Sequence, residues 1–325
     1  MRNIAVVLAG GRGARMKQKL NKVLLKVCGK PLILHIIDVL KQKKLEIYVV
    51  VGVNSEIPSV LGESVKYVVQ NEPLGTGHAL RLVCDVIGSV EANVLVINGD
   101  GPIVDEKLVD EMLKLTDCEA KLLVDKCCSE HKFGRILRDE NGLICDIIEA
   151  KDCDAEQLKI NEVNLGVYCF KNRFLVRNVA KICRNNAQNE YYLTDLVNLL
   201  YQENCKISDV NASNFEYFLS VNTLEELRKM EEKMQASIQR KLLDKGVRII
   251  GNVYVDSLSK IEGNVILNPN CVIENSVLNS GCEIGANSVI NNCVVMQDIK
   301  IGACCIVQGV DVLNNIENGS KMLKK

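Results

Sequence analysis

A loop rich in glycine and positive charge follows the first apolar run of the chain. Residues 8–25 read LAGGRGARMKQKLNKVLL, and they carry the cations Arg12, Arg15 and Lys22 among three glycines. Glycines let backbone N–H groups approach a phosphate closely, and the cations neutralise its charge. Such a loop could hold a redox dinucleotide, anchor a transferable phosphate, or simply turn a corner.

Two well-known phosphate-binding motifs are absent from this loop. In the dinucleotide fingerprint G-x-G-x-x-G a third glycine would follow Gly11 and Gly13, but Met16 stands in its place. No acidic residue ends the second apolar run, and the Walker A pattern G-x-x-x-x-G-K-[ST] does not occur. The remaining interpretation is a loop that binds a nucleoside triphosphate.

Two further stretches place polar side chains after expected strands. In QNEPLGTGHA (70–79) the amide of Gln70 offers both a donor and an acceptor, which suits the edge of a pyrimidine base. In NGDGP (98–102) Asp100 follows an apolar run, at the strand end where open parallel sheets bind ligands. A carboxylate between glycines suits a hydrated Mg²⁺, whereas the same residue in an ordinary turn would need no ligand.

Apolar runs that alternate with helical patterns position these residues. We expect buried strands over residues 3–9, 46–52, 65–70 and 93–99, and helices over 31–43 and 78–86. Continuous apolar strands that alternate with helices predict a parallel sheet covered on both faces. Residues 1–224 therefore fit one α/β domain.

A charged helix and a change of composition mark the second half of the chain. Residues 225–246 fit a connecting helix, with Thr223 and Glu226 as a capping box and Gly246 at its end. Over 247–325 apolar residues recur every six positions, with one five-residue step. The predicted core positions are Ile266, Val272, Leu278, Ile284, Ile290, Val295, Ile301 and Val307. This period predicts a parallel β-helix of hexapeptide repeats, whereas an irregular β-sandwich would not need fixed spacing.

The composition argues against several classes of function. The 325 residues carry a formal net charge of -1, which gives no support to nucleic-acid or membrane-surface binding. No apolar stretch approaches the roughly 18 residues that span a bilayer, and the N-terminus does not resemble a signal peptide. We expect a soluble, cytoplasmic protein in which the 15 cysteines are small buried hydrophobic residues and not metal ligands.

Several short motifs occur together along the first 195 residues of the chain. They are LAGGRGARM, Lys22, GKPLI, GTGHA, NGD, FGRI, IIEAKD, VNLGVY and EYYLTD, in that order. Jointly they resemble the uridylyltransferase domain of the bifunctional bacterial N-acetylglucosamine-1-phosphate uridylyltransferase/glucosamine-1-phosphate acetyltransferase family. The resemblance covers residues 1–310. It implies a Rossmann-like α/β nucleotidyltransferase domain followed by a short parallel β-helix of the left-handed type.

The resemblance also implies roles for individual residues. Arg15 and Lys22 would be the catalytic cations that bind the phosphates. The nucleotide would be held at Leu8, Ala9, Gly10, Gly11, Gln70, Gly75 and Thr76. The sugar would contact Gly134, Glu149, Asn164, Tyr192 and Thr194. Asp100 and Asn222 would hold Mg²⁺.

Two residues depart from the family pattern. Ala14 stands where the family usually has Thr or Ser, and Asn21 where it usually has Pro before the lysine. Ala14 removes a hydroxyl that could touch phosphate, and we expect Asn21 to loosen the loop. Since neither change removes a charge, we expect weaker binding at most.

The implied reaction is the Mg²⁺-dependent synthesis of UDP-N-acetylglucosamine and pyrophosphate from UTP and N-acetylglucosamine-1-phosphate. The attacking phosphate is already ionised near neutral pH, so alignment and charge neutralisation suffice. This agrees with the absence of a catalytic His or Cys arrangement in the sequence. Two alternatives stay open: a uridylyltransferase for another sugar-1-phosphate, and a non-catalytic regulatory or scaffold subunit of the same fold.

The resemblance carries two further expectations. The acetyl-CoA site and catalytic histidine of the family lie in later coils of the β-helix, whereas this sequence ends at Lys325 and has no histidine after His131. We therefore expect no acetyltransferase activity. We also expect a homo-oligomer, a trimer as in the family, with no nucleic-acid or membrane partner.

Overall fold

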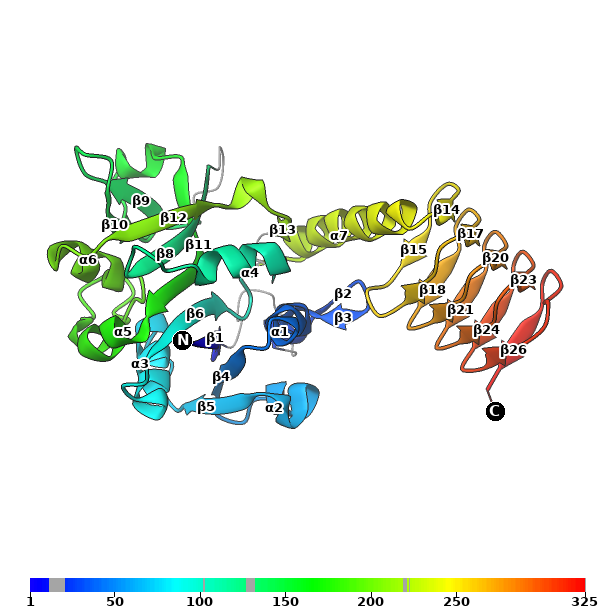
Figure 1. Ribbon diagram of the computed structural model, residues 1–325, viewed down its shortest axis with the longest axis horizontal. Helices are drawn as coiled ribbons and strands as arrows, with labels where there is room; N and C mark the ends of the chain where they lie inside the picture. Colours follow the sequence, from blue (N-terminus) through cyan, green and yellow to red (C-terminus); the bar gives the residue numbers. More distant parts are fainter. Residues whose placement is uncertain (12–20, 102, 127–131, 219–220, 222, 325) are drawn as a thin grey trace. The chain divides into compact units, whose positions relative to one another are not determined.

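The computed structural model describes residues 1–11, 21–101, 103–126, 132–218, 221 and 223–324. The chain divides into two compact units (Figure 1). The first unit comprises Met1–Leu24 and Leu32–Asn222, and the second comprises Leu25–Pro31 and Thr223–Lys325. Among the described residues, no helix is both long and apolar enough to cross a membrane.

A nine-stranded sheet forms the centre of the first unit, in the order β10-β9-β11-β6-β1-β4-β5, with β8 paired to both β11 and β12. Its strands are β1 Arg2–Ala9, β4 Glu46–Gly52, β5 Lys66–Gln70, β6 Ala92–Asn98, β8 Ala120–Lys126, β9 Arg135–Arg138, β10 Ile144–Ile148, β11 Glu162–Lys171 and β12 Ile207–Asn211. Strands β6, β1, β4 and β5 are mutually parallel, as the sequence predicts. Strand β11 runs antiparallel to β6, β8 and β9, so the sheet is mixed, which the apolar runs did not reveal.

Helices cover both faces of this sheet. They are α1 Leu32–Gln42, α2 Ile57–Leu61, α3 Thr76–Ile87, α4 Glu106–Leu113, α5 Asn172–Asn178 and α6 Asp195–Gln202. Because strand side chains alternate between faces, Ile4, Val6 and Leu8 share one core cluster with residues of α3, α5 and α6. Helices α1 and α4 contact the sheet and each other separately. The expected covering on both faces is confirmed.

Short elements complete the first unit. The 3₁₀ turns are η2 Lys22–Leu24, η3 Gly62–Ser64, η4 Gln157–Lys159, η5 Val179–Lys181 and η6 Ala212–Asn214. A small antiparallel pair joins β7 Ile103–Val104 to β13 Tyr217–Phe218.

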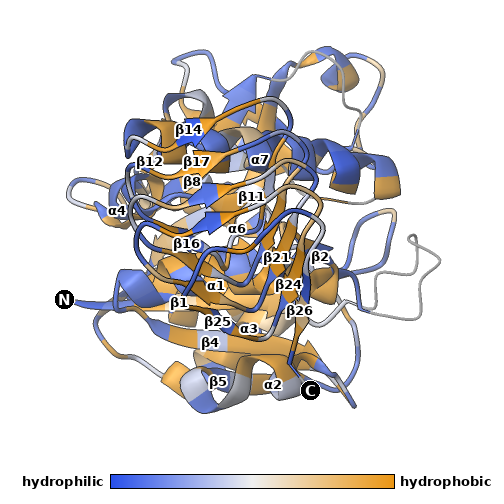
Figure 2. Cartoon of the chain, turned by 90° about the vertical axis from the view of Figure 1, so that its right-hand side faces the viewer, coloured by the Kyte–Doolittle hydropathy of each residue, from blue (hydrophilic) through white to orange (hydrophobic). Residues whose placement is uncertain are grey.

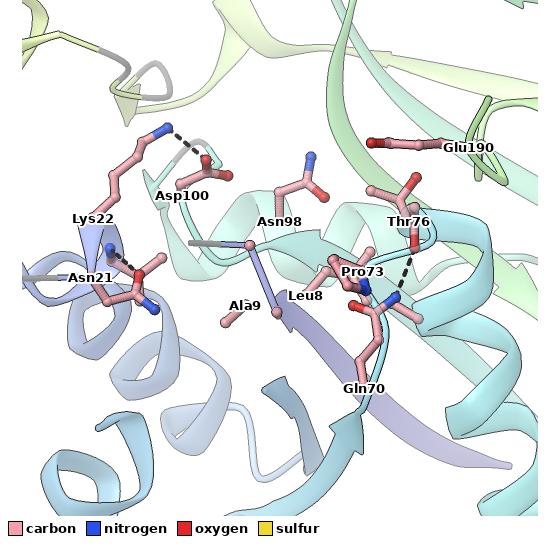
Figure 3. A pocket seen from close by; sticks show the side chains of 15 residues that line it. Leu8, Ala9, Asn21, Lys22, Gln70, Pro73, Thr76, Asn98, Asp100 and Glu190 are labelled. Carbon is pink, nitrogen blue, oxygen red and sulfur yellow. Dashed lines mark hydrogen bonds and ion pairs between the residues drawn. The ribbon is translucent and has the colours of Figure 1, made fainter. Parts of the chain in front are cut away.

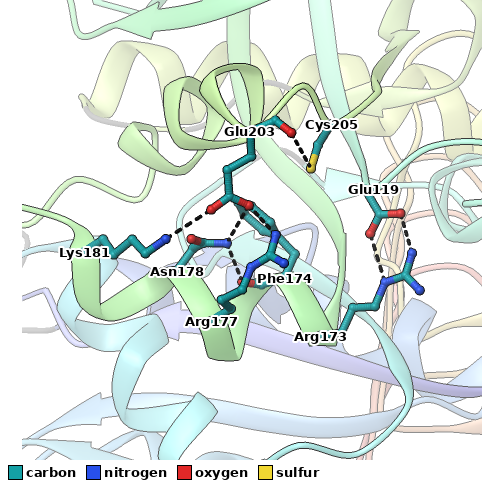
Figure 4. A network of polar contacts seen from close by, with 8 residues as sticks. All are labelled: Glu119, Arg173, Phe174, Arg177, Asn178, Lys181, Glu203 and Cys205. Atoms are coloured by element: carbon teal, nitrogen blue, oxygen red, sulfur yellow. Dashed lines mark hydrogen bonds and ion pairs between the residues drawn. The ribbon is translucent and has the colours of Figure 1, made fainter.

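Surface ion pairs join α5 and the turn after it to neighbouring loops (Figure 4). Glu203 accepts hydrogen bonds from Arg177 and Lys181, and Glu119 accepts them from Arg173. These cations are largely exposed, so solvent screens the pairs and each adds little to stability. The buried apolar cluster, not this network, therefore holds α5 against the sheet.

The second unit begins with a long capped helix, α7 Leu224–Asp244. Thr223 and Glu226 form the predicted capping box, with the Thr223 side chain accepting from the Glu226 N–H at 3.1 Å. Gly246 follows the helix with φ +85°, a conformation that suits glycine. The predicted connecting helix is therefore present, with both of its end signals.

Three parallel sheets form the β-helix after α7. Four β-helix coils each contribute one short strand to each sheet, and the second sheet gains a fifth strand, β26. The first sheet has β14 Arg248–Ile249, β17 Ile266–Leu267, β20 Glu283–Ile284 and β23 Lys300–Ile301. The second has β15 Tyr254–Val255, β18 Val272–Glu274, β21 Val289–Asn291, β24 Ile306–Gln308 and β26 Lys321–Leu323. The third has β16 Lys260–Ile261, β19 Val277–Leu278, β22 Val294–Val295 and β25 Asp311–Val312. Figure 2 shows that both hydrophilic and hydrophobic residues occur in these short strands, as in Arg248–Ile249 and Lys300–Ile301.

The repeat of the β-helix differs slightly from the predicted one. From β16 to β25 neighbouring coils pair residues 17 apart in sequence, such as Val272 with Val289, because the three sides span six, six and five residues. The first coil pairs residues 18 apart, as Tyr254 with Val272. The prediction placed a single five-residue step before Val295 and missed a second step before Leu278. As a result Ile266 and Val272 are wrong by one position, since Leu267 and Ile273 are the buried residues there. The other six predicted core positions are buried.

Small residues stack in columns at the corners of the β-helix. One column runs through Cys271, Ser288 and Cys305, all of them buried. Ser288 Oγ donates to the Gly302 carbonyl at 2.8 Å and accepts from the Cys305 N–H at 3.0 Å. Among the described residues every cysteine is free, and most are buried, which confirms their expected role as small hydrophobic residues.

A hairpin from the N-terminal half belongs to the second unit. It consists of β2 Lys26–Val27 and β3 Lys30–Pro31. The backbone of Cys28 in its turn donates to Glu231 Oε1 at 3.2 Å and accepts from the Ser257 N–H at 2.9 Å. The sequence predicted one continuous domain over 1–224 and gave no sign that these residues pack with the β-helix.

Replacing Ser288 by Ala should destabilise the β-helix. The substitution leaves the Gly302 carbonyl and the Cys305 N–H without the buried hydroxyl that joins them. We expect the free energy of unfolding, measured by urea denaturation with circular dichroism, to fall by about 1–3 kcal/mol. Ser280→Ala is the matched control, because that serine is half-buried and its hydrogen bonds use backbone atoms: its N–H donates to Glu262, and its carbonyl accepts from the Asp298 N–H. Equal losses in both variants would contradict this account.

Candidate active site

The carboxyl ends of the parallel strands gather polar groups at one edge of the first unit's sheet. Strand β1 ends at Ala9, β5 at Gln70 and β6 at Asn98. Because these strands run parallel, their ends meet at one edge, the usual ligand site of open α/β sheets. Figure 3 shows the side chains of this edge around a common space.

A cavity of about 270 Å³ occupies this edge. Nine of the residues predicted for nucleotide, phosphate and metal binding line it: Leu8, Ala9, Gly10, Gly11, Lys22, Gln70, Gly75, Thr76 and Asp100. These residues come from three strand ends and two loops, so only the folded sheet brings them together. We call this space the nucleotide cavity.

Lys22 and Asp100 form an ion pair in the wall of the nucleotide cavity. Lys22 Nζ donates to Asp100 Oδ2 at 2.6 Å (Figure 3). The lysine side chain is 6% exposed and the aspartate 41% exposed. A buried ammonium needs a nearby negative charge, and the carboxylate supplies it. The sequence assigned these two residues to different ligands and did not foresee their contact.

Asn21 acts differently from the expectation that it loosens the loop. Its Oδ1 accepts from the Val23 N–H at 3.3 Å, and its carbonyl accepts from the Leu24 N–H at 2.9 Å. An asparagine at this position caps a turn as it would cap a helix. Asn21 therefore fixes the start of η2, the turn that carries Lys22.

A second cavity, of about 230 Å³, adjoins the first. Four of the five residues predicted to contact the sugar line it: Gly134, Glu149, Asn164 and Thr194. Thr76, Asn98 and Asp100 line both cavities. A ligand in each cavity would therefore meet its neighbour beside Asp100. We call the second space the sugar cavity.

Glu149 is a buried carboxyl at the sugar cavity. Burial raises its pKa above the ordinary range, and a hydrogen bond from the Thr194 hydroxyl at 3.3 Å acts in the opposite direction. A buried carboxyl of this kind can accept a hydrogen bond from a ligand hydroxyl or amide once it is ionised. Its pocket suits a polar ring, not an apolar one.

An irregularity in β11 shapes the same cavity. The register between β11 and β8 shifts between Asn164 and Tyr168, as at a β-bulge. Asn164 Nδ2 donates to the Tyr168 hydroxyl at 2.6 Å, and its Oδ1 accepts from the Gly166 N–H at 3.1 Å. Both ends of the amide are thus anchored by protein groups, so Asn164 holds the wall of the cavity rigid.

Three predicted residues are not placed in either cavity. Tyr192 lines neither one; its hydroxyl accepts from Gln188 at 2.8 Å, and burial raises its pKa to about 12. Arg15 and Asn222 lie outside the described residues, so their roles stay predictions.

Sequence reasoning missed several residues that line the cavities. Asn98 and Glu190 border the nucleotide cavity, and Tyr168 and Lys132 border the sugar cavity. A signal existed for Asn98, which precedes Asp100 in the same NGDG turn. Tyr168 lies inside an apolar strand run, where its type alone suggests only packing.

Family models match both halves of the chain. A MobA-like NTP transferase domain matches residues 5–158, and a fucose pyrophosphorylase domain matches residues 169–323. In the solved structures, a Bacillus anthracis protein assigned as a glucose-1-phosphate thymidylyltransferase matches with a TM-score of 0.58 and 24% identity, covering 71% of this chain and 94% of that one. This last likeness concerns the fold alone.

Curated relatives carry the name bifunctional protein GlmU. Those of Alkaliphilus metalliredigens and Clostridium novyi are 36% and 37% identical over 86% of this chain, covering 67% and 63% of the relative. That of Bacillus subtilis is 35% identical over 85% of this chain and 62% of the relative. The chain thus spans about two thirds of the length of the relatives it matches.

The fold and the paired cavities define a nucleotidyltransferase of the sugar-1-phosphate type. Given the extent and level of identity with these relatives, the chain belongs to the GlmU family. The resemblance seen in the sequence motifs is therefore confirmed, as is the predicted fold class.

Replacing Gly75 by Ala should disturb the turn before α3. Gly75 has φ +111°, and an added Cβ would lie 2.5 Å from the Tyr191 carbonyl oxygen. Both the conformation and the backbone contact oppose a side chain, so we expect a loss of about 2 kcal/mol or more of unfolding free energy. Thermal and urea unfolding measure it. Gly11→Ala is the control, since among the described residues no atom lies within 4 Å of its added Cβ; similar losses in both would contradict the prediction.

Proposed function

We propose that the first unit transfers a uridylyl group from UTP to N-acetylglucosamine-1-phosphate and releases pyrophosphate. A phosphate oxygen of the sugar-1-phosphate attacks the α-phosphorus of UTP. The bond between the α-phosphorus and the bridging oxygen breaks, and pyrophosphate leaves with the negative charge. The products are UDP-N-acetylglucosamine and pyrophosphate.

The observation that carries the proposal is the pair of cavities with a shared wall. Thr76, Asn98 and Asp100 border both spaces, so a nucleotide in one and a sugar phosphate in the other would have their phosphates side by side. Holding two reactants in this way supplies much of the rate enhancement in a transfer between phosphates. A protein that binds only one ligand would not need two adjoining polar cavities.

The charges at the shared wall suit phosphoryl chemistry. Lys22 is held at the nucleotide cavity by Asn21 and Asp100, so its ammonium is oriented before substrate arrives. A fixed cation offsets the negative charge that grows on leaving pyrophosphate. The attacking phosphate is ionised near neutral pH, and a general base is not required.

Mg²⁺ is the cofactor we propose, with Asp100 as the protein ligand in the described part of the chain. No group of three or more His, Cys, Asp or Glu residues that could hold a metal occurs among the described residues. This fits Mg²⁺, which is commonly bound by one or two carboxylates together with water and substrate phosphates. When bound, the ion would supply charge neutralisation at the α-phosphate. Asn222 stays a predicted second ligand.

The specificity for base and sugar is the finer part of the proposal. Gln70 borders the nucleotide cavity and provides an amide for a pyrimidine. Glu149 and Thr194 provide polar groups for the ring of an N-acetylated sugar. The same transfer chemistry would serve an enzyme that acts on another sugar-1-phosphate or on a thymidine nucleotide. A scaffold subunit would carry out no transfer. A trimer through the β-helix stays a prediction from the resemblance.

Pyrophosphate release tests this assignment. We would measure Mg²⁺-dependent release with UTP, CTP, dTTP and GTP against a panel of sugar-1-phosphates. We expect UTP with N-acetylglucosamine-1-phosphate to give the highest kcat/KM. A higher value for another pair would keep the transfer chemistry and overturn the substrates. Folded protein that is silent with every pair would instead favour the scaffold alternative.

Lys22→Ala and Asp100→Ala test the shared wall. Each substitution removes a charge that faces the phosphates, and we expect kcat/KM to fall about 100-fold or more, equivalent to about 3 kcal/mol in the transition state. Lys26→Ala is the control, because Lys26 is an exposed lysine four positions further along the chain and lines neither cavity. Near-wild-type turnover of either site variant would contradict the assignment.

A further inference from the structure

The amide of Gln70 is oriented by two acceptors. Its side-chain nitrogen Nε2 lies 3.1 Å from the Gly75 carbonyl oxygen and 3.1 Å from His78 Nδ1. A carbonyl oxygen can only accept, so it must face the NH₂ end of the amide. The two hydrogens of Nε2 are then both used, one by Gly75 and one by His78. Gln70 itself is only 6% exposed, so its side chain has little room to reorient.

His78 is fixed beside this amide by its place in α3. It is the third residue of the helix, and its half-buried ring lies 6.2 Å from that of Tyr191. Because Gln70 Nε2 offers only hydrogens, His78 Nδ1 must be the acceptor of this contact. The histidine therefore makes a directional contact, in addition to filling space.

The remaining atom of the amide, Oε1, is the one left for a ligand. An added Cβ on Gly10 would lie 2.5 Å from Oε1, which places that oxygen against the backbone at the end of β1. In Figure 3 the oxygen points toward Leu8 and Ala9, on the opposite side from the bonded nitrogen. Within the described part of the chain, Oε1 accepts no hydrogen bond from protein. Gln70 thus offers the nucleotide cavity an acceptor.

We propose that His78 is a positioning residue that sets the orientation of the Gln70 amide and thereby selects uracil over cytosine. This inference rests on the proposed function, whose base specificity it explains. Uracil carries an N–H at ring position 3, which donates to an acceptor such as Oε1. Cytosine carries a bare nitrogen at the same position, which needs a donor. A fixed acceptor therefore favours the uracil base, and a freely rotating amide favours neither.

Replacing the histidine by an apolar residue should relax this selection. In His78→Leu one hydrogen of Gln70 Nε2 loses its partner, and only the Gly75 carbonyl still restrains the amide. The amide can then turn and offer Nε2 to cytosine. Sites built around a directed hydrogen bond discriminate strongly, and they lose that discrimination when the directing partner is removed.

The test compares kcat/KM for UTP and CTP in the full chain with saturating N-acetylglucosamine-1-phosphate. We expect His78→Leu to lower the ratio of UTP to CTP at least about tenfold, with most of the change in KM. His78→Asn should restore most of the ratio relative to His78→Leu, because its Oδ1 occupies the place of Nδ1 and also accepts. Asp85→Asn, an exposed change two turns further along α3, is the control for helix effects and should keep the wild-type ratio.

Equilibrium binding of UTP and CTP, measured by calorimetry on the same proteins, separates this inference from the proposed function. If wild-type protein turns over no nucleotide but binds UTP more tightly than CTP, the proposed transfer reaction is wrong. The binding ratio of the His78 variants then still tests whether His78 positions Gln70. An unchanged ratio in His78→Leu, or an equal loss in His78→Asn, would overturn the positioning role. His78→Ala provides a second truncation, with the same expected loss, in case circular dichroism shows that the leucine variant does not fold.

Discussion

Two opposite charges hold the centre of the site in place. The ammonium of Lys22 is almost fully buried and lies 2.6 Å from the carboxylate of Asp100, 78 residues away in the sequence. Leaving a buried ammonium without a partner costs several kcal/mol, so the turn η2 must stay against the end of β6. The pair thereby joins η2 to Asp100, one of the three residues that line both cavities. It also keeps a cation beside the position where phosphates would react.

The two parts of the mixed sheet supply the two cavities. The parallel strands β1 and β5 end in the residues that surround the nucleotide cavity, Gly10 and Gln70 among them. The antiparallel strand β11 carries Asn164 and Tyr168 on the wall of the sugar cavity. Because β11 pairs directly with β6, whose end carries Asp100, the antiparallel addition brings a second binding space next to the first. The mixed topology is therefore what places two polar cavities side by side.

Sequence patterns predict the parts of this structure that depend on burial. The apolar runs that end at Ala9 and Gly52 are strands because continuous burial leaves no polar face to expose, whereas the strand that ends at Gln70 alternates exposed and buried residues. The closeness of the residues at the strand ends can also be predicted, because the carboxyl ends of parallel strands lie at the same edge of the sheet. The second five-residue step of the β-helix was not predicted, because Ile266 and Val272 are as apolar as the buried neighbours that follow them.

Contacts between particular side chains were not predicted either. Nothing in the residue types of Lys22 and Asp100, or of Gln70 and His78, shows that they touch. Such contacts depend on rotamers and on the packing of distant segments.

The second unit contains a short segment from the N-terminal part of the chain. The segment Leu25–Pro31 packs with the second unit, although Lys22–Leu24 before it and α1 after it belong to the first. Gln235 of α7 reinforces this arrangement, donating to the Val255 carbonyl at 2.8 Å and to Cys28 Sγ at 3.3 Å. Cys28 is bonded to residues more than 200 positions later in the sequence, through its backbone N–H to Glu231 and through its Sγ to Gln235. The hairpin of Leu25–Pro31 is therefore held within the second unit by α7 and by the first part of the β-helix, so one unit is built from two separate stretches of sequence.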